Sequence, residues 1–389
     1  MGSRSDSRAN QVVSALRELG SANRTELQEA TGQSAATLSR AINDLREAGA
    51  VEPPPVAPGK HSRHPLRYQL VQSAPVAGLV VGNGRIDACV SKRLNEVESR
   101  LTVPAQETRP GELMRRCIHL LQELLETASI TPQELGALTI GLPLAVNRRH
   151  GARPTRVLAD WRSLDVQSIF GKLLQDSGFS EELTQRLEVG QVANLGALGA
   201  RLDPNLGSSP DLVYFYVGDC LLTGSLVNGE LCREASGLIG HMLPLVSKYP
   251  QAVCPTCGRE CVEEQALRYM QEATGLSSME QVVGMALEHD VEATCALMEL
   301  ARLLAHPAAV VCLMLDPEYV VLGGEMGREA ACATELHVRM TELLPDHLNQ
   351  SADVVSDTGV EVGQTRLPMP LAGALEVARQ RLYTAEPIL

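Results

Sequence analysis

The sequence predicts an α/β protein in two parts, a winged helix-turn-helix of residues 1–72 and a larger α/β domain of residues 73–389. Three observations support this class. The chain of 389 residues is too long for one ordinary core. Helical periodicity with glycine stops fills the first 50 residues, and beyond residue 75 strand-like apolar runs alternate with helical stretches. A hydrophobic content of 44% indicates a folded chain.

The first two helices are defined by their ends. The first places four apolar residues on one face before Gly20, namely Val12, Val13, Leu16 and Leu19. Asn23 then stands three residues before Glu26, which predicts a capping box at the start of the second helix. Gly32 closes that helix and leaves a tight turn before the third.

The third helix is predicted to begin at a Ser34 cap and to stop at Gly49. Its inward face carries Leu38, Ile42 and Leu45. The residues left outward are Ser34, Ala36, Thr37, Arg40 and Asn43. Small, hydroxyl, amide and guanidinium side chains at the start of such a helix can reach base edges and phosphates in a major groove. We therefore predict double-stranded DNA as a partner; a generic three-helix bundle with a polar face is the alternative.

A basic segment follows the third helix. Val51 begins a short strand, a proline-rich stretch interrupts it, and a second strand-like run follows at residues 66–71. The basic residues between them are Lys60, His61, Arg63, His64 and Arg67. A basic loop between two strands after a recognition helix is typical of a wing that contacts phosphates or the minor groove. A basic interdomain linker is the other interpretation.

The distribution of charge along the chain and the expected compartment agree with the prediction of DNA binding. Residues 1–75 carry nine Lys and Arg against seven Asp and Glu, and the remainder carries 25 against 40. A slightly basic N-terminal part joined to an acidic remainder suits a protein in which only the N-terminal part contacts phosphates, although any solvated small domain has similar charges. No uninterrupted apolar run reaches ~18 residues and the N-terminus lacks a signal-peptide core, so we expect a cytoplasmic protein without a membrane partner.

The region from about residue 75 to 389 alternates strands and helices. The expected strands are 76–81, 137–140, 212–217, 225–227 and 319–322. The expected helices lie near 111–128, 165–177, 262–273, 290–305 and 371–382.

The strongest chemical signal is a cysteine cluster. Cys254, Cys257 and Cys261 fall within eight residues, with a glycine that lets the chain curl. Three thiols so spaced can hold a structural Zn²⁺, and His241 is the candidate fourth ligand. A redox pair would use only the first two thiols, and three incidental thiols are the remaining alternative.

The order of motifs resembles the ROK family of repressors and sugar kinases, in its repressor branch with an N-terminal winged helix. The motifs that carry the resemblance are Gly141–Pro143 with Asn147, Trp161, Ala193–Gly199, Asn228–Gly229, Gly240–His241, the cysteine cluster, Val320–Gly324 and Ala372–Leu375. The resemblance implies a bacterial protein with a two-lobed actin/hexokinase-like fold, an effector in the cleft and a zinc site of one His and three Cys. The middle cysteine here stands one position later than the family spacing.

The kinase motifs depart from the family pattern. The first phosphate turn, residues 79–85, lacks the family's Asp and Thr, and the second reads Gly218-Asp-Cys-Leu-Leu222. Val192 stands at the catalytic Asp position, and valine cannot accept a proton. We therefore predict that the protein is not an enzyme.

The sugar-binding positions are also altered. Gln191 replaces the family's Asn, and Leu238 replaces a hydroxyl-binding Glu. Asn147, Gln191 and His241 remain as candidate contacts for a sugar or another metabolite. We predict a DNA-binding transcriptional regulator, a repressor, that forms a homodimer or homotetramer and associates with the nucleoid when bound to DNA. An active sugar kinase and a ligand-independent DNA-binding or oligomerisation protein are the alternatives.

Overall fold

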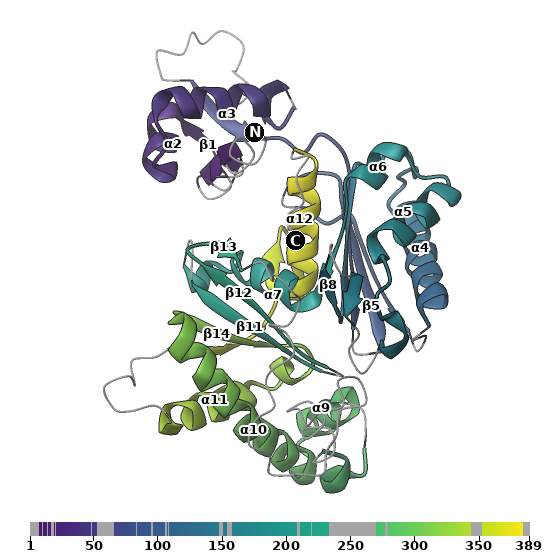
Figure 1. Cartoon of the computed structure of the whole chain (residues 1–389), viewed down its shortest axis with the longest axis vertical. Helices are drawn as coiled ribbons and strands as arrows, with labels where there is room; N and C mark the ends of the chain where they lie inside the picture. Colours follow the sequence, from purple (N-terminus) through teal and green to yellow (C-terminus); the bar gives the residue numbers. More distant parts are fainter. Residues whose placement is uncertain are drawn as a thin grey trace.

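The protein has an N-terminal unit beside two α/β lobes, with the C-terminal helix α12 (Met369–Arg381) between them (Figure 1). The computed structural model describes residues 8–9, 11–13, 15–16, 19, 21–47, 49–52, 66–82, 84–94, 96–105, 107, 109–147, 151–153, 158–207, 211–218, 220–232, 270–276, 279–343 and 352–383.

The N-terminal unit contains three helical segments and a small antiparallel sheet. Described residues between 8 and 19 are helical, and the elements that follow are β1 (Ser21–Asn23), α2 (Arg24–Thr31), α3 (Ala35–Glu47), β2 (Val51–Glu52) and β3 (Arg67–Leu70). The sheet order is β1-β3-β2. The unit has its own buried core, which includes Leu16, Leu38 and Tyr68.

The predicted helix ends are confirmed. Asn23 and Glu26 form the complete capping box of α2, and Gly32 follows it with a left-handed φ of 64°. The Ser34 hydroxyl accepts a hydrogen bond from the Thr37 amide at 3.3 Å at the start of α3. Leu19 was expected on the buried face of the first helix, and this is wrong, because its side chain is 48% exposed.

The first lobe is a five-stranded sheet in the order β10-β7-β4-β5-β6. Its elements are β4 (Val76–Gly82), β5 (Arg85–Ser91), β6 (Ser99–Pro104), α4 (Pro110–Thr127), β7 (Ala137–Leu142), β8 (Ala145–Asn147), β9 (Gly151–Arg153), α5 (Val166–Asp176), α6 (Glu181–Gln185) and β10 (Leu187–Gln191). Helices α4 and α5 pack their apolar faces on this sheet, and Trp161 is fully buried in the same core. Trp161 therefore fills core space in the first lobe.

The second lobe repeats this plan, with a sheet in the order β13-β12-β11-β14-β15. Its elements are α7 (Val192–Ala200), β11 (Leu212–Val217), β12 (Leu221–Val227), β13 (Glu230–Leu231), α9 (Met279–Leu287), α10 (Val291–Leu315), β14 (Tyr319–Gly323), α11 (Ala330–Leu343), β15 (Asp353–Ser356), β16 (Val360–Val362) and β17 (Thr365–Leu367). In each lobe the first strand pairs antiparallel with the next and parallel with a later one. The five predicted strands are therefore present, and the other strands of the two sheets, β5, β6, β10, β13 and β15, were missed.

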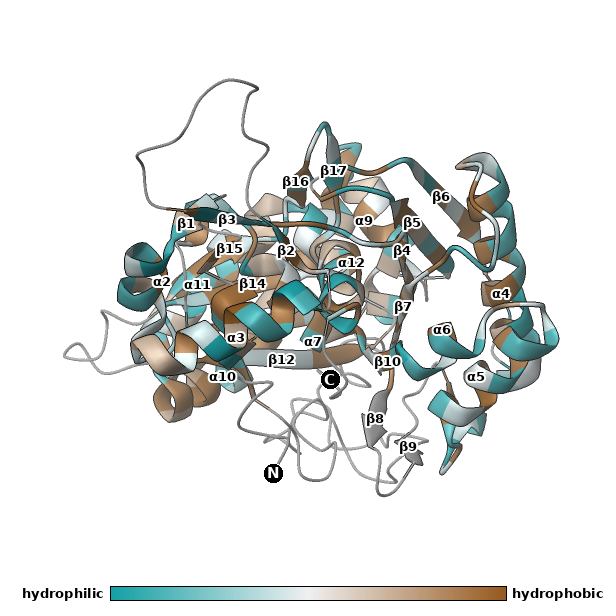
Figure 2. Ribbon diagram, turned by 90° about the horizontal axis from the view of Figure 1, so that it is seen from above, coloured by the Kyte–Doolittle hydropathy of each residue, from teal (hydrophilic) through white to brown (hydrophobic). Residues whose placement is uncertain are grey.

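Helix α10 runs ten residues beyond its expected end at 305, through Pro307. Proline removes one helical hydrogen bond, but Pro307 and the residues around it are buried against the second-lobe core, which compensates. Among the described residues, α10 is the one helix long and apolar enough to cross a membrane, and its most apolar stretch of 18 residues has a mean hydropathy of 1.6. Half of that stretch is buried in the lobe, and Figure 2 shows α10 mostly in hydrophobic colours.

Helices α7 and α12 cross between the lobes at two glycines. A Cβ on Gly199 would lie 1.8 Å from the Met369 carbonyl oxygen, and one on Gly373 would lie 1.9 Å from the Leu195 oxygen. Any larger residue would therefore push the helices apart. The glycine- and alanine-rich motifs at 193–199 and 372–375 thus have a structural role in the close approach of these helices.

Candidate functional site

The outward face of α3 is the first candidate surface. Ser34, Ala36, Arg40 and Asn43 are exposed and Thr37 is half-buried. Leu38, Ile42 and Leu45 are buried against the rest of the unit. The predicted orientation of the helix is therefore confirmed, and Arg40 forms no ion pair with any residue that the structure describes.

Two arginines connect the helices of the N-terminal unit to its sheet. The Arg24 side chain donates to the Tyr68 hydroxyl at 3.2 Å and to the Ser39 hydroxyl at 3.3 Å, which joins α2, β3 and α3. Arg67, at the end of the predicted basic segment, pairs with Glu26 at 2.9 Å and so serves the fold. The wing candidates Lys60, His61, Arg63 and His64 lie outside the described residues.

The N-terminal unit is joined to the first lobe through the C-terminal end of α12. The Arg379 guanidinium donates to the side chains of Gln72 at 3.3 Å and Ser91 at 3.2 Å. The Tyr383 hydroxyl donates to the Val71 carbonyl oxygen. Residues 71 and 72 connect the N-terminal sheet to β4, so α12 holds the connection between the two parts of the chain.

Two of the three effector candidates lie on neighbouring strands of the first lobe. Gln191 ends β10 beside Leu142 of β7, and Asn147 ends β8, which contacts β10. Gln191 is 3% exposed, and neither its amide oxygen nor its amide nitrogen has a hydrogen-bond partner among the residues that the structure describes. A buried amide without partners costs free energy, so this side chain is available to a ligand at the strand ends. The third candidate, His241, lies outside the described residues.

The catalytic position is apolar. Val192 is fully buried at the first turn of α7, in the core between the lobes. Leu221 and Leu222, at the end of the second phosphate motif, are the first two residues of β12 and pack into two different cores.

The first phosphate turn contains an arginine that joins the two lobes. Arg85 of β5 pairs with Asp87 at 3.1 Å and, across the lobes, with Glu325 after β14 at 2.6 Å. Glu325 is fully buried and also pairs with Arg328 at 2.7 Å. Burial disfavours the charged guanidinium, but Glu325 and Asp87 outweigh it and raise the pKa of Arg85. The turn therefore carries a guanidinium that is neutralised by carboxylates from both lobes.

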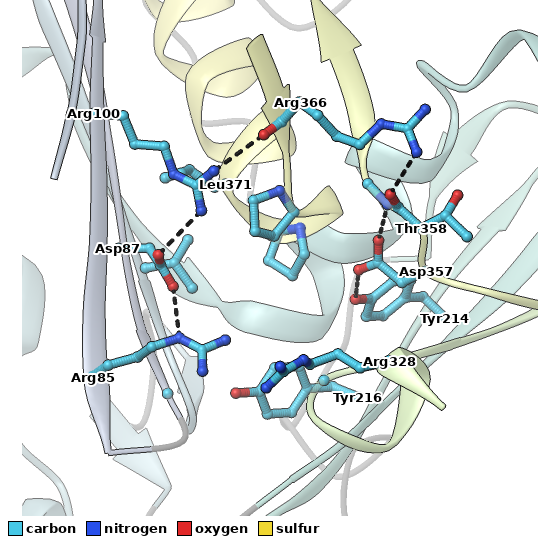
Figure 3. A pocket seen from close by; sticks show the side chains of 16 residues that line it. Arg85, Asp87, Arg100, Tyr214, Tyr216, Arg328, Asp357, Thr358, Arg366 and Leu371 are labelled. Atoms are coloured by element: carbon cyan, nitrogen blue, oxygen red, sulfur yellow. Dashed lines mark hydrogen bonds and ion pairs between the residues drawn. The ribbon is translucent and has the colours of Figure 1, made fainter. Parts of the chain in front are cut away.

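A cavity of about 290 Å³ lies beside this arginine (Figure 3). The charged and tyrosine side chains around it are Arg85, Asp87, Arg100, Tyr214, Tyr216, Arg328, Asp357 and Arg366. Asp357 accepts a 2.6 Å hydrogen bond from the Tyr214 hydroxyl. Burial raises the pKa of Asp357 and also raises the pKa of Tyr214 well above its usual value. Sequence reasoning missed this cavity, and its only sequence signal was an arginine at position 85.

Three of the thiols that the structure describes are buried where they cannot ionise readily. Burial raises the pKa of Cys89, Cys117 and Cys332 to about 12, which keeps them protonated. Cys254, Cys257 and Cys261, like His241, lie outside the described residues, so the expected zinc site is neither placed nor tested by the fold.

Comparison with known proteins gives the same architecture. The chain is 23% identical to the xylose repressor of Caldicellulosiruptor bescii over 325 residues, 78% of this chain and 79% of that protein. A ROK family transcriptional regulator, a homologue of the E. coli Mlc protein, superposes with a TM-score of 0.65 at 17% identity over 97% of both chains. A ROK family glucokinase from Streptomyces griseus superposes with a TM-score of 0.62 at 19% identity, over 79% of this chain and 99% of that one.

Two similar lobes around a shared cleft define the class of sugar-kinase-like, actin/hexokinase-type α/β proteins, as predicted. The ROK family model matches residues 76–380, and the chain belongs to the ROK family.

Proposed function

We propose that this protein is a DNA-binding transcriptional repressor whose two-lobed domain binds a small-molecule effector and does not transfer phosphate. The observation that carries the proposal is the outward face of α3, where Arg40 is exposed and has no ion-pair partner among the described residues. This helix belongs to a capped helix-turn-helix, and the ROK family model matches residues 76–380 of the same chain. Helix, sheet and basic segment follow the order of a winged helix-turn-helix. The similarity to a xylose repressor supports the same role.

A mobility-shift titration tests the proposal. Full-length protein and genomic fragments from the source organism should give a discrete complex in the nanomolar range that resists excess random DNA. Affinity should fall steeply between ~50 and ~200 mM salt, because phosphate contacts release counterions. Equal binding to all fragments, or none, would refute the proposal.

The cleft should not support phosphoryl transfer. Val192 at the catalytic position supplies no general base, and the first phosphate turn lacks the Asp and Thr of the family pattern. We expect no ADP release above the protein-free rate when the protein meets ATP, Mg²⁺ and a panel of sugars. Sustained turnover would favour the alternative of a working sugar kinase, and a Gly199→Leu variant, misfolded at the α7–α12 crossing, would identify a contaminating kinase.

We further propose a structural Zn²⁺ held by His241, Cys254, Cys257 and Cys261. One imidazole and three thiolates form a donor set that Zn²⁺ prefers in structural sites. Purified protein should contain about one zinc per chain by elemental analysis, and Cys257→Ser should lose it and unfold at a lower temperature. Cys295→Ser is the matched control, because that thiol is exposed on α10. Full zinc content in Cys257→Ser would contradict the site.

We also propose that the protein forms a homodimer or homotetramer. A two-fold symmetric protein presents two recognition helices to half-sites one or more helical turns apart. The proposed setting is the bacterial cytoplasm, with the protein on the nucleoid when it is bound to DNA.

A further inference from the structure

Guanidinium groups form most of the charged lining of the cavity next to Arg85. Four of them line it, from Arg85, Arg100, Arg328 and Arg366, against the carboxylates of Asp87 and Asp357. Two further carboxylates pair with these arginines from outside the lining, Glu325 with Arg85 and Arg328, and Glu361 with Arg366, so the formal charges balance. The cavity itself is nevertheless faced mainly by the cationic partners of these ion pairs, which suits an anionic ligand.

The hydrogen-bonding groups of the lining include more free donors than free acceptors. Both oxygens of Asp87 are used, by Thr102 and Arg100 on one and by Arg85 on the other. Both oxygens of Asp357 are used as well, by the Tyr214 hydroxyl and by backbone amides. Each guanidinium has five N–H groups, and those of Arg328 bond only to Glu325 among the described residues. The cavity therefore offers donors and few acceptors, which suits a ligand rich in acceptors.

The rest of the lining fixes the size and shape of such a ligand. Val80, Leu371 and two prolines at the start of α12 form the apolar floor of the cavity, and Figure 3 shows Arg85 and Arg100 on the opposite side from Asp357 and Tyr214. A volume of about 290 Å³ is at the low end for a small-molecule site. A compact metabolite fits this space better than a nucleoside triphosphate.

We propose that this cavity binds a small metabolite carrying a carboxylate or phosphate group, at a site separate from the Gln191 strand ends. Arg366 and Arg328 are the main contacts, because they are 59% and 46% exposed and lie on opposite sides of Asp357. A neutral sugar would leave the charged donors without acceptors and bind poorly.

The location of the cavity suggests what the ligand controls. Helix α12 begins at the cavity floor, at Pro368, and ends at the Arg379 and Tyr383 contacts with the connection to the N-terminal unit. A helix of 13 residues spans ~20 Å as one rigid element. A ligand that shifts the first turn of α12 would thus alter the position of the DNA-binding unit. This regulatory part rests on the proposed function, whereas the binding site does not.

Calorimetric titration of the full-length protein tests the site, with citrate as the carboxylate probe, glucose 6-phosphate as the phosphate probe and xylose as the neutral control, at constant ionic strength. At least one anion should bind and xylose should not bind here. Arg366→Gln and Arg328→Gln should each weaken anion binding about tenfold or more. Arg339→Gln is the matched control, since it removes the same charge from an exposed ion pair on α11.

The outcomes separate the two proposals. Binding of citrate alone or glucose 6-phosphate alone identifies the oxyanion and supports the site. No anion binding, or equal binding by both cavity variants and Arg339→Gln, overturns it while leaving DNA binding untouched. An anion that binds to a protein without DNA affinity would support the cavity and refute the proposed function. An anion that binds but leaves DNA affinity unchanged would overturn the role of α12.

Discussion

Replacing Arg40 with alanine is expected to abolish specific DNA binding. Arg40 is exposed on the outward face of α3 and has no ion-pair partner among the described residues, so its guanidinium is free for a base edge. A bidentate arginine–guanine contact contributes ~1–3 kcal/mol. Because the proposed symmetric dimer would make the contact twice, the expected loss is ~2–6 kcal/mol, or roughly 30-fold to more than 10⁴-fold in affinity.

Arg46→Ala is the control for this prediction. Arg46 is also exposed on α3 but lies in its last turn, away from the end that enters the groove. It should weaken binding to specific and random DNA about equally and only slightly. Circular dichroism should show both variants folded, and Arg40→Ala with unchanged specific affinity would refute the assignment of α3 as the recognition helix.

Among the substitutions proposed for these ion pairs, Arg381→Met is expected to lower the free energy of unfolding the most. Arg381 at the end of α12 is 5% exposed and pairs with Glu188 of β10, 1% exposed, at 3.3 Å. It also donates to the Gln185 carbonyl oxygen at 2.5 Å. Removing it leaves a carboxylate buried without its cation, which costs ~3–5 kcal/mol. Urea denaturation followed by fluorescence should show a lower midpoint for the transition that reports on the lobes.

A double variant identifies the cause of that loss. Arg381→Met with Glu188→Leu removes both charges, and well-packed apolar pairs are often as stable as the ion pairs they replace. The double variant should therefore recover most of the lost stability. Arg339→Met, which breaks a partly exposed pair, should cost no more than ~1 kcal/mol. If the double variant were less stable than Arg381→Met, the cost would come from packing and the electrostatic explanation would be wrong.

The parts of the fold that depend on local sequence were predictable. The capping box of Asn23 and Glu26 and the left-handed Gly32 are set by residues within one turn of each other. β5 was missed because Arg85 and Asp87 interrupt its apolar pattern. Those charges are partly buried because they pair with each other and because Arg85 also pairs with Glu325 of the second lobe, whereas a periodicity argument counts charged residues as solvent-exposed.

The candidate sites were predictable to different degrees. The outward set on α3 follows from helical spacing and needed no tertiary information. The cavity required four distant segments to meet, residues 80–100, 214–216, 324–328 and 357–371, and nothing local marks their convergence. Asp357 illustrates this, since its partner Tyr214 lies 143 residues away in the chain.

We propose above all that the N-terminal unit binds specific DNA sequences and that the ROK domain attached to it has no kinase activity. DNase I footprinting of the full-length protein on a fragment recovered from its own genome tests this most directly. The structure predicts two protected half-sites whose centres are separated by whole helical turns of ~10–10.5 base pairs, and no protection with Arg40→Ala. Protection that is absent, continuous along the fragment, or identical for Arg40→Ala would contradict the account.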